Sequence, residues 1–295
     1  MAEMSPDIRG ALELSIGQCA ALACLLEVAA PKPGNVHRGA DFEDMTFVDF
    51  AVSAVAIGPA LDKAVREGVG EAVRSAIQAT RAMVPTNTNL GTVLLLAPLA
   101  AVPREQPLQP GVRQVLAALT PRDSESVYAA IRLARPGGLG QVEAMDVAAA
   151  APADLLEAME AARGRDLIAR QYVTGFAIVL DEVLPWLLAG PGQGWTLADT
   201  IVHTQLRLLG RYGDSLIARK CGPSVDAQVT LRAAYVLEAG GPGERAYHEA
   251  VADLDFWLRS DRHRRNPGTT ADLIAAGLFA ALRDGLLHPS LGQGS

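Results

Sequence analysis

The sequence has few aromatic residues, few cysteines and no excess of positive charge. Phe, Trp and Tyr make up 5% of the 295 residues, although 49% are hydrophobic, so Ala, Leu and Val must supply most of the core. Since strands prefer β-branched and aromatic residues, this composition favours helices over sheets. The three cysteines, Cys19, Cys24 and Cys221, lack CxxC spacing, and such an odd set is typical of reduced thiols in a cytoplasmic protein.

The net charge of −7 argues against a nucleic-acid partner, because such a partner requires a basic face. It does not exclude a nucleotide substrate, since a few local cations and a metal ion can hold a triphosphate. The longest apolar run, Leu90 to Val102, is too short to span a bilayer and contains Pro98. Residues 1–10 carry Glu3 and Asp7 and no apolar stretch of the kind found in signal peptides. We therefore expect a cytoplasmic protein without membrane contact.

Apolar residues recur at helical spacing along the chain, and no alternating strand of convincing length is present. An apolar stripe from Ile168 to Leu187 predicts one long helix, whose last turn Pro185 would kink, and three prolines predict a loop over Pro103–Pro110. Helices are also predicted over about 12–26, 46–66, 70–83, 94–99 and 128–134, with further starts near Thr196, Asp214, Ser224, Glu244 and Thr269. The sequence thus predicts an all-α fold: a single multi-helix globular domain over residues 1–295, with a possible hinge at Gly190–Gly194.

In an all-helical protein, chemistry is carried by inward-facing side chains or by the turns between helices, and four polar turns are candidates here. The first turn places three cations and three carboxylates close together: Lys32, His37, Arg38, Asp41, Glu43 and Asp44. The cations could hold phosphate oxygens and the carboxylates could hold a hard cation such as Mg²⁺. The alternative is a solvated loop whose acids cap the next helix at its positive end.

The second turn, Thr86-Asn87-Thr88-Asn89, precedes an apolar helix, so its backbone N–H groups could attract an anion. Ordinary N-capping by Thr88 or Asn89 explains it equally well. The third turn carries Gly137, Gly138 and Gly140, with Asp146 beyond it. Such a glycine-rich loop allows a ligand to approach the backbone closely, but by itself it is weak evidence for a binding site.

The fourth turn runs from Asn266 to Asp272, and its Thr269 and Asp272 fit a capping box. Two helical segments add further charged residues. Asp166 and Arg170 have the i,i+4 spacing of a surface salt bridge. Asp214 stands at one helix start with Lys220 at its end, a layout that the helix dipole alone rationalises.

Taken in order, these segments resemble the triphosphoribosyl-dephospho-CoA synthase family. The matching blocks are PKPGNVHRGADFEDM, TNTNLGTVLLLAPL, RPGGLG, RDLIARQY, DSLIARKCG and NPGTTADLIAAGLF. The resemblance implies an all-α enzyme that transfers the triphosphoribosyl group of ATP to the 2′-hydroxyl of 3′-dephospho-CoA and releases adenine. The product of that family is a prosthetic-group precursor with α configuration at the new bond. Since ATP is β, this implies a single displacement at the anomeric carbon.

Such a reaction needs a carboxylate near an oxocarbenium-like ribose, a general acid for adenine, a base for the acceptor hydroxyl, and Mg²⁺ with cations for the triphosphate. The resemblance implies these catalytic candidates: Asp41, Glu43, Asp44, Asp146, Asp166 and Asp214, of which Asp41, Glu43 and Asp44 are also the candidate metal ligands. It implies these substrate-binding candidates: Lys32, Asn35, His37, Arg38, Thr86, Asn87, Thr88, Asn89, Lys220, Asn266, Thr269, Thr270 and Asp272.

Two segments, Pro103 to Pro121 and Ala148 to Pro152, show no motif of the family. If either shapes the acceptor pocket, the acceptor differs, and the protein is a related ATP-dependent ribosyl transferase of another cofactor pathway. A third hypothesis is a non-catalytic nucleotide-binding helical module, in which the polar turns would not converge. Apolar helix faces are also compatible with a homodimer.

Overall fold

The computed structural model describes residues 13–136 and 150–287. Within these residues the chain forms fifteen α-helices, a π-helix and a 3₁₀-helix, and no β-strand. In chain order the elements are α2 (Ile16–Ala29), α3 (Phe47–Leu61), α4 (Ala64–Glu67), α5 (Val69–Met83), α6 (Leu90–Ala100), α7 (Leu108–Ala117), α8 (Pro121–Ala134), α9 (Leu155–Ala162), α10 (Leu167–Thr174), η1 (Ile178–Val183), α11 (Leu184–Ala189), η2 (Pro191–Gln193), α12 (Leu197–Tyr212), α13 (Ser215–Cys221), α14 (Pro223–Glu238), α15 (Arg245–Arg259) and α16 (Gly268–Arg283). The predicted all-α class is confirmed.

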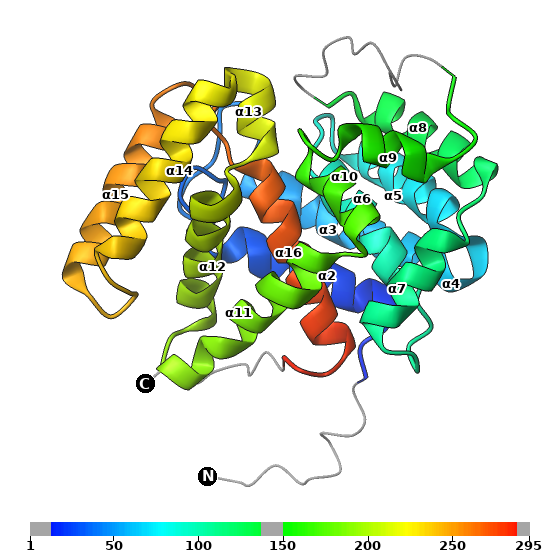
Figure 1. Cartoon of the computed structure of the whole chain (residues 1–295), viewed down its shortest axis with the longest axis horizontal. Coiled ribbons are helices and arrows are strands. Elements are labelled where there is room, and N and C mark those ends of the chain that lie inside the picture. The colour runs from blue at the N-terminus through cyan, green and yellow to red at the C-terminus, as the bar shows by residue number, and fades with distance from the viewer. Residues whose placement is uncertain (1–12, 137–149, 288–295) are drawn as a thin grey trace, which may run out of the picture.

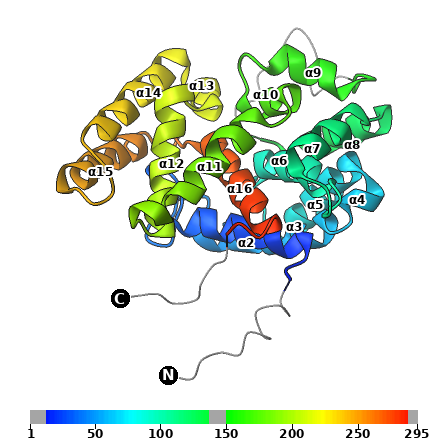
Figure 2. The same cartoon turned by 60° about the horizontal axis from the view of Figure 1, so that its bottom comes forward.

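The last helix, α16, is the axis on which the others pack. Every residue from Leu273 to Arg283 is buried, because the helix is apolar on all sides. It contacts α2, α6, η1, α11 and α12, and both views show it running through the middle of the molecule (Figures 1 and 2). The N-terminal end of α16, with the fourth polar turn, is therefore held inside the fold.

Two hydrophobic cores lie on either side of this axis. The larger core is built by helices α2 to α12 together with α16. The smaller one joins α12 to α15 through side chains such as Leu206, Val229 and Leu254. In Figure 1, α13, α14 and α15 lie on one side of α16 and α3 to α9 on the other. The second polar turn and the start of the fourth border the space between these two sides.

The single long helix predicted over Ile168–Leu187 is wrong. The chain bends by 93° between α10 and the segment that starts at Ile178. At the bend, Gly175 and Phe176 both have a φ of 65°, a left-handed conformation that is uncommon for a residue other than glycine. Apolar periodicity continues through the bend, so the sequence pattern did not reveal it.

The buried side chain of Gln171 stabilises this bend. Its Oε1 accepts the N–H groups of Ile178 and Val179 at 3.1 and 3.3 Å, and its Nε2 donates to the carbonyl of Leu167 at 3.2 Å. The chain continues as the π-helix η1, and Pro185 then lies in the first turn of α11, where a missing N–H costs little. Pro185 is therefore not the cause of the bend.

Two further predictions need correction. The helix predicted over 46–66 ends at Leu61, where the Asp62 carboxylate accepts the N–H of Gly17 at 2.6 Å, and the chain restarts as α4. The predicted loop Pro103–Pro110 gives way to α7 at Leu108, because a proline is tolerated in the first turn of a helix. The segment Gly190–Gly194 contains η2, and its role as a hinge stays a prediction.

No single helix in the two described ranges is both long and apolar enough to cross a bilayer. The bent pair of Leu167–Thr174 and Ile178–Gln193 meets that criterion by length and composition alone.

Candidate active site

A cavity of about 1410 Å³ lies between the two sides of the molecule. Its walls come from α2, α3, α6, α8, α9, α10, α13 and α16 and from the turns before α6, α10 and α16. This volume exceeds the roughly 300–1,000 Å³ of most small-molecule sites, so the cavity has room for more than one ligand.

Eleven of the predicted site residues line this cavity: Asn35, Asp44, Thr86, Asn87, Thr88, Asn89, Asp166, Lys220, Asn266, Thr269 and Asp272. Seven others do not line it: Lys32, His37, Arg38, Asp41, Glu43, Asp214 and Thr270. The third turn, with Gly137, Gly138, Gly140 and Asp146, lies outside the described residues. Five sequence blocks that are far apart in the chain thus share one cavity.

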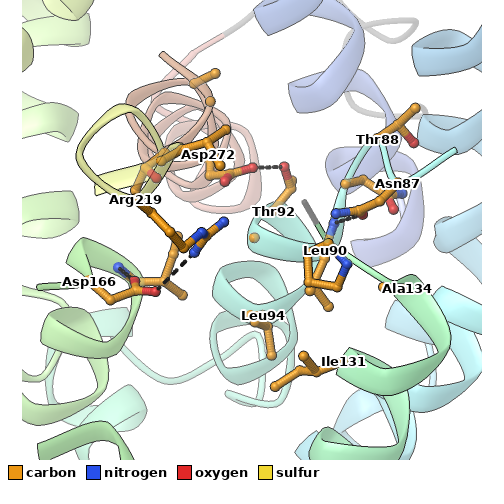
Figure 3. Close-up of a pocket in the computed structure, with 18 of the residues that line it drawn as sticks. Asn87, Thr88, Leu90, Thr92, Leu94, Ile131, Ala134, Asp166, Arg219 and Asp272 are labelled. Atoms are coloured by element: carbon orange, nitrogen blue, oxygen red, sulfur yellow. Dashed lines mark hydrogen bonds and ion pairs between the residues drawn. The ribbon is translucent and has the colours of Figure 1, made fainter. Parts of the chain in front are cut away.

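Asp272 of α16 reaches across the cavity wall to α6. The hydroxyl of Thr92 donates to its Oδ1 at 2.6 Å (Figure 3). A Cβ added to Gly91 would lie 2.0 Å from Oδ2, so only glycine allows the carboxyl group to approach α6 this closely. The predicted capping box of Thr269 and Asp272 is therefore wrong, because Asp272 bonds to a helix 180 residues away in sequence and not to its own helix start.

The surroundings of Asp272 favour its neutral form. Burial, together with the nearby carboxylates Glu27, Asp214 and Asp166, raises the pKa of Asp272 to about 8, although the Thr92 hydroxyl opposes the shift. Asp272 is partly exposed, and the exposed part lines the cavity. It can therefore offer a proton to a ligand near neutral pH.

Three helix starts meet beside Asp272. The Ser215 hydroxyl at the start of α13 accepts the N–H of Leu167, in the first turn of α10, at 3.3 Å. The same hydroxyl lies 3.0 Å from Oγ1 of Thr269 in the first turn of α16. Helix N-termini carry partial positive charge, so their convergence favours an anionic ligand.

Asp214 ties two of these helix starts together from within the protein. One of its oxygens accepts the N–H groups of Leu216 and Ile217 at 2.9 and 3.3 Å, and the other accepts that of Thr270 at 2.8 Å. The Thr270 hydroxyl donates to the carbonyl of Pro267 at 3.0 Å. Asp214 is fully buried, does not line the cavity and caps two helix starts, and its predicted catalytic role stays a prediction. Thr270 is also fully buried and does not line the cavity.

The second turn is held by three different partners. Asn87 Oδ1 accepts the N–H of Leu90 at 3.1 Å, so Asn87 caps α6. The sequence had suggested Thr88 or Asn89 for this role. The Thr88 hydroxyl lies 2.6 Å from that of Ser53 on α3, and Asn89 Nδ2 donates to Thr80 at 3.0 Å. These contacts fix the turn at the cavity wall, where Figure 3 shows Asn87 and Thr88.

Asp166 lines the cavity at the start of α10. Its Oδ1 accepts the N–H groups of Ile168 and Ala169 at 2.8 and 3.3 Å, and its Oδ2 lies 3.9 Å from Nη1 of Arg219 (Figure 3). The predicted i,i+4 pair with Arg170 does not form, because the Arg170 guanidinium packs over the Tyr212 ring at 5.3 Å.

Six cations face the cavity, and four carboxylates accompany them. The cations are Arg81, Arg132, Arg135, Arg165, Arg219 and Lys220, and the carboxylates are Glu27, Asp44, Asp166 and Asp272. Burial and the neighbouring Arg219 lower the pKa of Lys220. Sequence reasoning missed Glu27 and all five arginines, since basic residues near helix ends are equally common on solvated surfaces. The net positive charge of this lining suits a polyphosphate.

The three predicted phosphate ligands of the first turn, Lys32, His37 and Arg38, do not line the cavity. Lys32 is fully buried; its Nζ lies 2.8 Å from the Glu27 carboxylate and donates to the carbonyl of Glu27. His37 accepts the N–H of Gly39 at 3.2 Å, and burial lowers its pKa. Arg38 is exposed and outside the cavity. Lys32 therefore neutralises a buried acid at the end of α2, and the other two cations lie away from the site.

The three carboxylates of the same turn have different surroundings, and the metal site predicted there stays a prediction. Asp41 Oδ1 accepts the N–H of Phe47 at 2.7 Å, which supports α3, and Glu43 is exposed. Of the three carboxylates only Asp44 reaches the cavity. Residues 13–136 and 150–287 contain no group of three His, Cys, Asp or Glu side chains placed to hold a metal ion.

Asn35 anchors the first turn to the start of α16. Its Nδ2 donates to Asn266 Oδ1 at 2.7 Å, and its Oδ1 accepts Nε2 of Gln205 at 2.6 Å. Asn35 is 7% exposed, so its amide is used mainly to position Asn266 at the cavity wall.

The cavity has a second, apolar part, which we call the apolar limb. It is formed by α6, α8, α9 and α10 through the side chains Leu94, Ile131, Leu155, Met159 and Ile168. Figure 3 shows Leu94 and Ile131 facing one another on the side of the cavity away from the Asp272–Thr92 pair. The cavity is therefore polar at one end and apolar at the other.

Comparison with known proteins agrees with this geometry. Over residues 13–289 the sequence matches the family described as ATP:dephospho-CoA triphosphoribosyl transferase. The fold is similar to the crystal structure of a protein from Archaeoglobus fulgidus that is provisionally named triphosphoribosyl-dephospho-CoA synthase. The two share 28% identity and a TM-score of 0.61, over 79% of this chain and 98% of the other. A search of curated proteins finds no match.

The resemblance stated from the motifs is thereby confirmed. Because the match extends over nearly the whole chain, the protein belongs to the ATP:dephospho-CoA triphosphoribosyl transferase family and is a transferase of prosthetic-group biosynthesis.

Proposed function

We propose that the protein transfers the triphosphoribosyl group of ATP to the 2′-hydroxyl of 3′-dephospho-CoA and releases adenine. The observation that carries this proposal is Asp272, a carboxyl group held neutral on the wall of a cavity lined with cations. The bond between ribose C1′ and adenine breaks while the bond from C1′ to the acceptor oxygen forms, and the configuration inverts.

Asp272 acts as the general acid in this proposal. Adenine is a poor leaving group as an anion and leaves more readily once a ring nitrogen is protonated. A carboxyl group with a pKa near 8 is protonated at neutral pH, as a donor for this step must be. Positioned acids contribute about 10²–10⁴-fold to a rate.

The triphosphate is bound at the polar end in this proposal. Arg219 and Lys220 approach from α13, and the starts of α6, α10 and α16, where helices carry partial positive charge, border the cavity. Arginine and helix termini together hold phosphate oxygens by charge-assisted hydrogen bonds. These groups position the ribose without cleaving the phosphate chain.

Mg²⁺ is proposed to accompany ATP. This ion usually takes one or two carboxylates together with substrate phosphates and waters, which fits the isolated carboxylate Asp44 better than a three-acid cage would. When bound, it would neutralise phosphate charge and order the chain.

Asp166 is the proposed base for the acceptor hydroxyl. Its Oδ1 is committed to the N–H groups of α10, whereas Oδ2 has only the loose contact with Arg219 among the described residues. An ionised carboxylate at this place would also stabilise positive charge that develops on the ribose.

Measuring adenine released from ATP, with and without dephospho-CoA, tests the proposal. We expect release to require dephospho-CoA and to fall by about 10²–10⁴-fold in Asp272→Asn. The control Asp253→Asn changes an exposed carboxylate on α15 and should behave as the wild type. Unchanged turnover in Asp272→Asn would contradict the assigned acid. ATP that binds but stays intact with dephospho-CoA would favour another acceptor, or a binding module if no acceptor supports cleavage.

The partners beyond these small molecules stay predictions. A homodimer without nucleic-acid or membrane partners, located in the cytoplasm, is what the sequence suggests. Light scattering of the purified protein tests the dimer.

A further inference from the structure

The apolar limb is not explained by ATP. The triphosphate requires cations, and the adenine that Asp272 protonates must lie at the polar end, beside Thr92 and Gly91. The donor therefore leaves the limb between α8, α9 and α10 unused. A cavity of about 1410 Å³ has room for a second ligand there.

The chemistry of the limb restricts what that ligand can be. The side chains that line the limb are aliphatic: Ile131 is half-buried, and Met159 and Ile168 keep 8% and 7% of their surface open. A phosphate or a sugar would lose its hydration there without compensation. A flexible chain of methylene and methyl groups would gain from burial of its apolar surface.

Cations stand at one side of the limb. Arg132 and Arg135 lie at the end of α8, and Arg165 lies directly before Asp166, the proposed base. An acceptor whose hydroxyl is near Asp166 would thus place its diphosphate beside arginines and its remaining part along Ile168 and Met159. A nucleoside diphosphate that carries a pantetheine arm has its groups in the same order: the ribose hydroxyl, then the diphosphate, then the arm.

We propose that the apolar limb binds the pantetheine arm of the acceptor, and that Ile131 and Met159 thereby select a CoA-type acceptor over a simple nucleotide. The inference rests on the proposed function for the identity of the acceptor. It adds which part of the cavity recognises that acceptor and which side chains do so.

The test fills the limb with a larger side chain. Ile131 is half-buried and faces the cavity, so Ile131→Trp narrows the limb without overfilling the core. The control is Leu231→Trp, which makes a similar change at a residue of α14 that is 71% exposed. Dissociation constants for dephospho-CoA and for ATP are measured by titration calorimetry, each ligand alone, so that the result does not depend on turnover.

We expect Ile131→Trp to weaken dephospho-CoA binding at least tenfold and to change ATP binding less than twofold, with both constants unchanged in Leu231→Trp. Free pantetheine should compete with dephospho-CoA but not with ATP in the wild type. A second variant, Arg165→Gln, changes an exposed side chain and should weaken dephospho-CoA several-fold more than ATP.

Three results would overturn the assignment. Weaker ATP binding with unchanged dephospho-CoA binding would place the donor in the limb. Equal binding of both ligands by Ile131→Trp and wild type would show that the limb is not used. If the wild type does not bind dephospho-CoA, dephospho-CoA is not the acceptor and the assignment of the limb fails. If dephospho-CoA binds but adenine is not released, only the proposed reaction fails.

Discussion

Two polar turns that look equally suited to catalysis have different places in the molecule. The turn over residues 31–44 is the richer in charge, with cations and carboxylates in close succession. The turn over residues 86–89 carries only hydroxyls and amides. The charged turn sends one carboxylate, Asp44, and one amide, Asn35, to the cavity, whereas all four side chains of the uncharged turn line it.

The difference shows that charge density along a sequence does not locate a site. Lys32 and Asp41 are occupied by partners that hold the fold together, the Glu27 carboxylate and the Phe47 N–H. The cavity obtains its cations instead from helix ends such as that of α13. The following predictions test this contrast.

The largest effect is expected at Lys32, on stability. Lys32→Met keeps the length of the side chain but leaves the Glu27 carboxylate, which is 8% exposed, without its cation. Breaking a buried ion pair from one side costs about 3–5 kcal/mol. Urea unfolding should show this loss, and the double variant Glu27→Gln with Lys32→Met should recover part of it. A stable Lys32→Met with weakened ATP binding would instead make Lys32 a phosphate ligand.

The next effect is a pH dependence that arises from Asp272. Since burial and like charges raise its pKa to about 8, a rise in pH through that value removes the proton that the reaction needs. We expect kcat/KM for ATP to fall above pH 8 by about tenfold per pH unit. A profile that stays flat to pH 9.5 would exclude Asp272 as the acid.

The same titration affects folding. The folded protein holds this proton more tightly than the unfolded chain, whose carboxyl group has a pKa near 3.9, so stability decreases as pH rises from about 4 to 8. Asp272→Asn, which cannot ionise, should therefore lose less stability than the wild type over this range in urea unfolding.

The smallest effect compares one arginine from each region. Arg219→Gln removes a cation from the cavity wall, and the loss of a charge-assisted contact of about 1.5–3 kcal/mol should raise the KM for ATP by about ten- to a hundredfold. Arg38→Gln, at an exposed position outside the cavity, should leave it unchanged. A larger rise in the KM for ATP in Arg38→Gln than in Arg219→Gln would show that the charged turn binds ATP.

Much of the fold was predictable because helical periodicity is a local property. Helices α5, α12, α14 and α16 begin within a few residues of their predicted starts. The bend after α10 was not predictable, since it depends on a side chain, that of Gln171, bonding to backbone groups seven and eight residues ahead. Such a bond leaves no trace in apolar spacing.

The sequence was sufficient to predict which segments line the cavity, but not what each residue does there. The blocks around Thr88, Asp166, Lys220 and Asp272 were identified, and all four residues line one cavity. The role proposed for Asp272 was not predictable, because it depends on a pKa that Thr92 and three acids from other helices influence. Asp214 looked equally acidic in sequence, yet its oxygens are bonded to three backbone N–H groups.

The contact between Gly91 and Asp272 makes one position in α6 a marker of inherited function. The methyl group of an alanine at position 91 would collide with Oδ2 of Asp272 and displace the carboxyl group. Alanine would at the same time increase the helix propensity of α6. Natural selection for a stable fold alone would therefore replace this glycine by alanine. The proposed role of Asp272 as the acid predicts that a homologue with alanine here has lost the reaction while remaining folded.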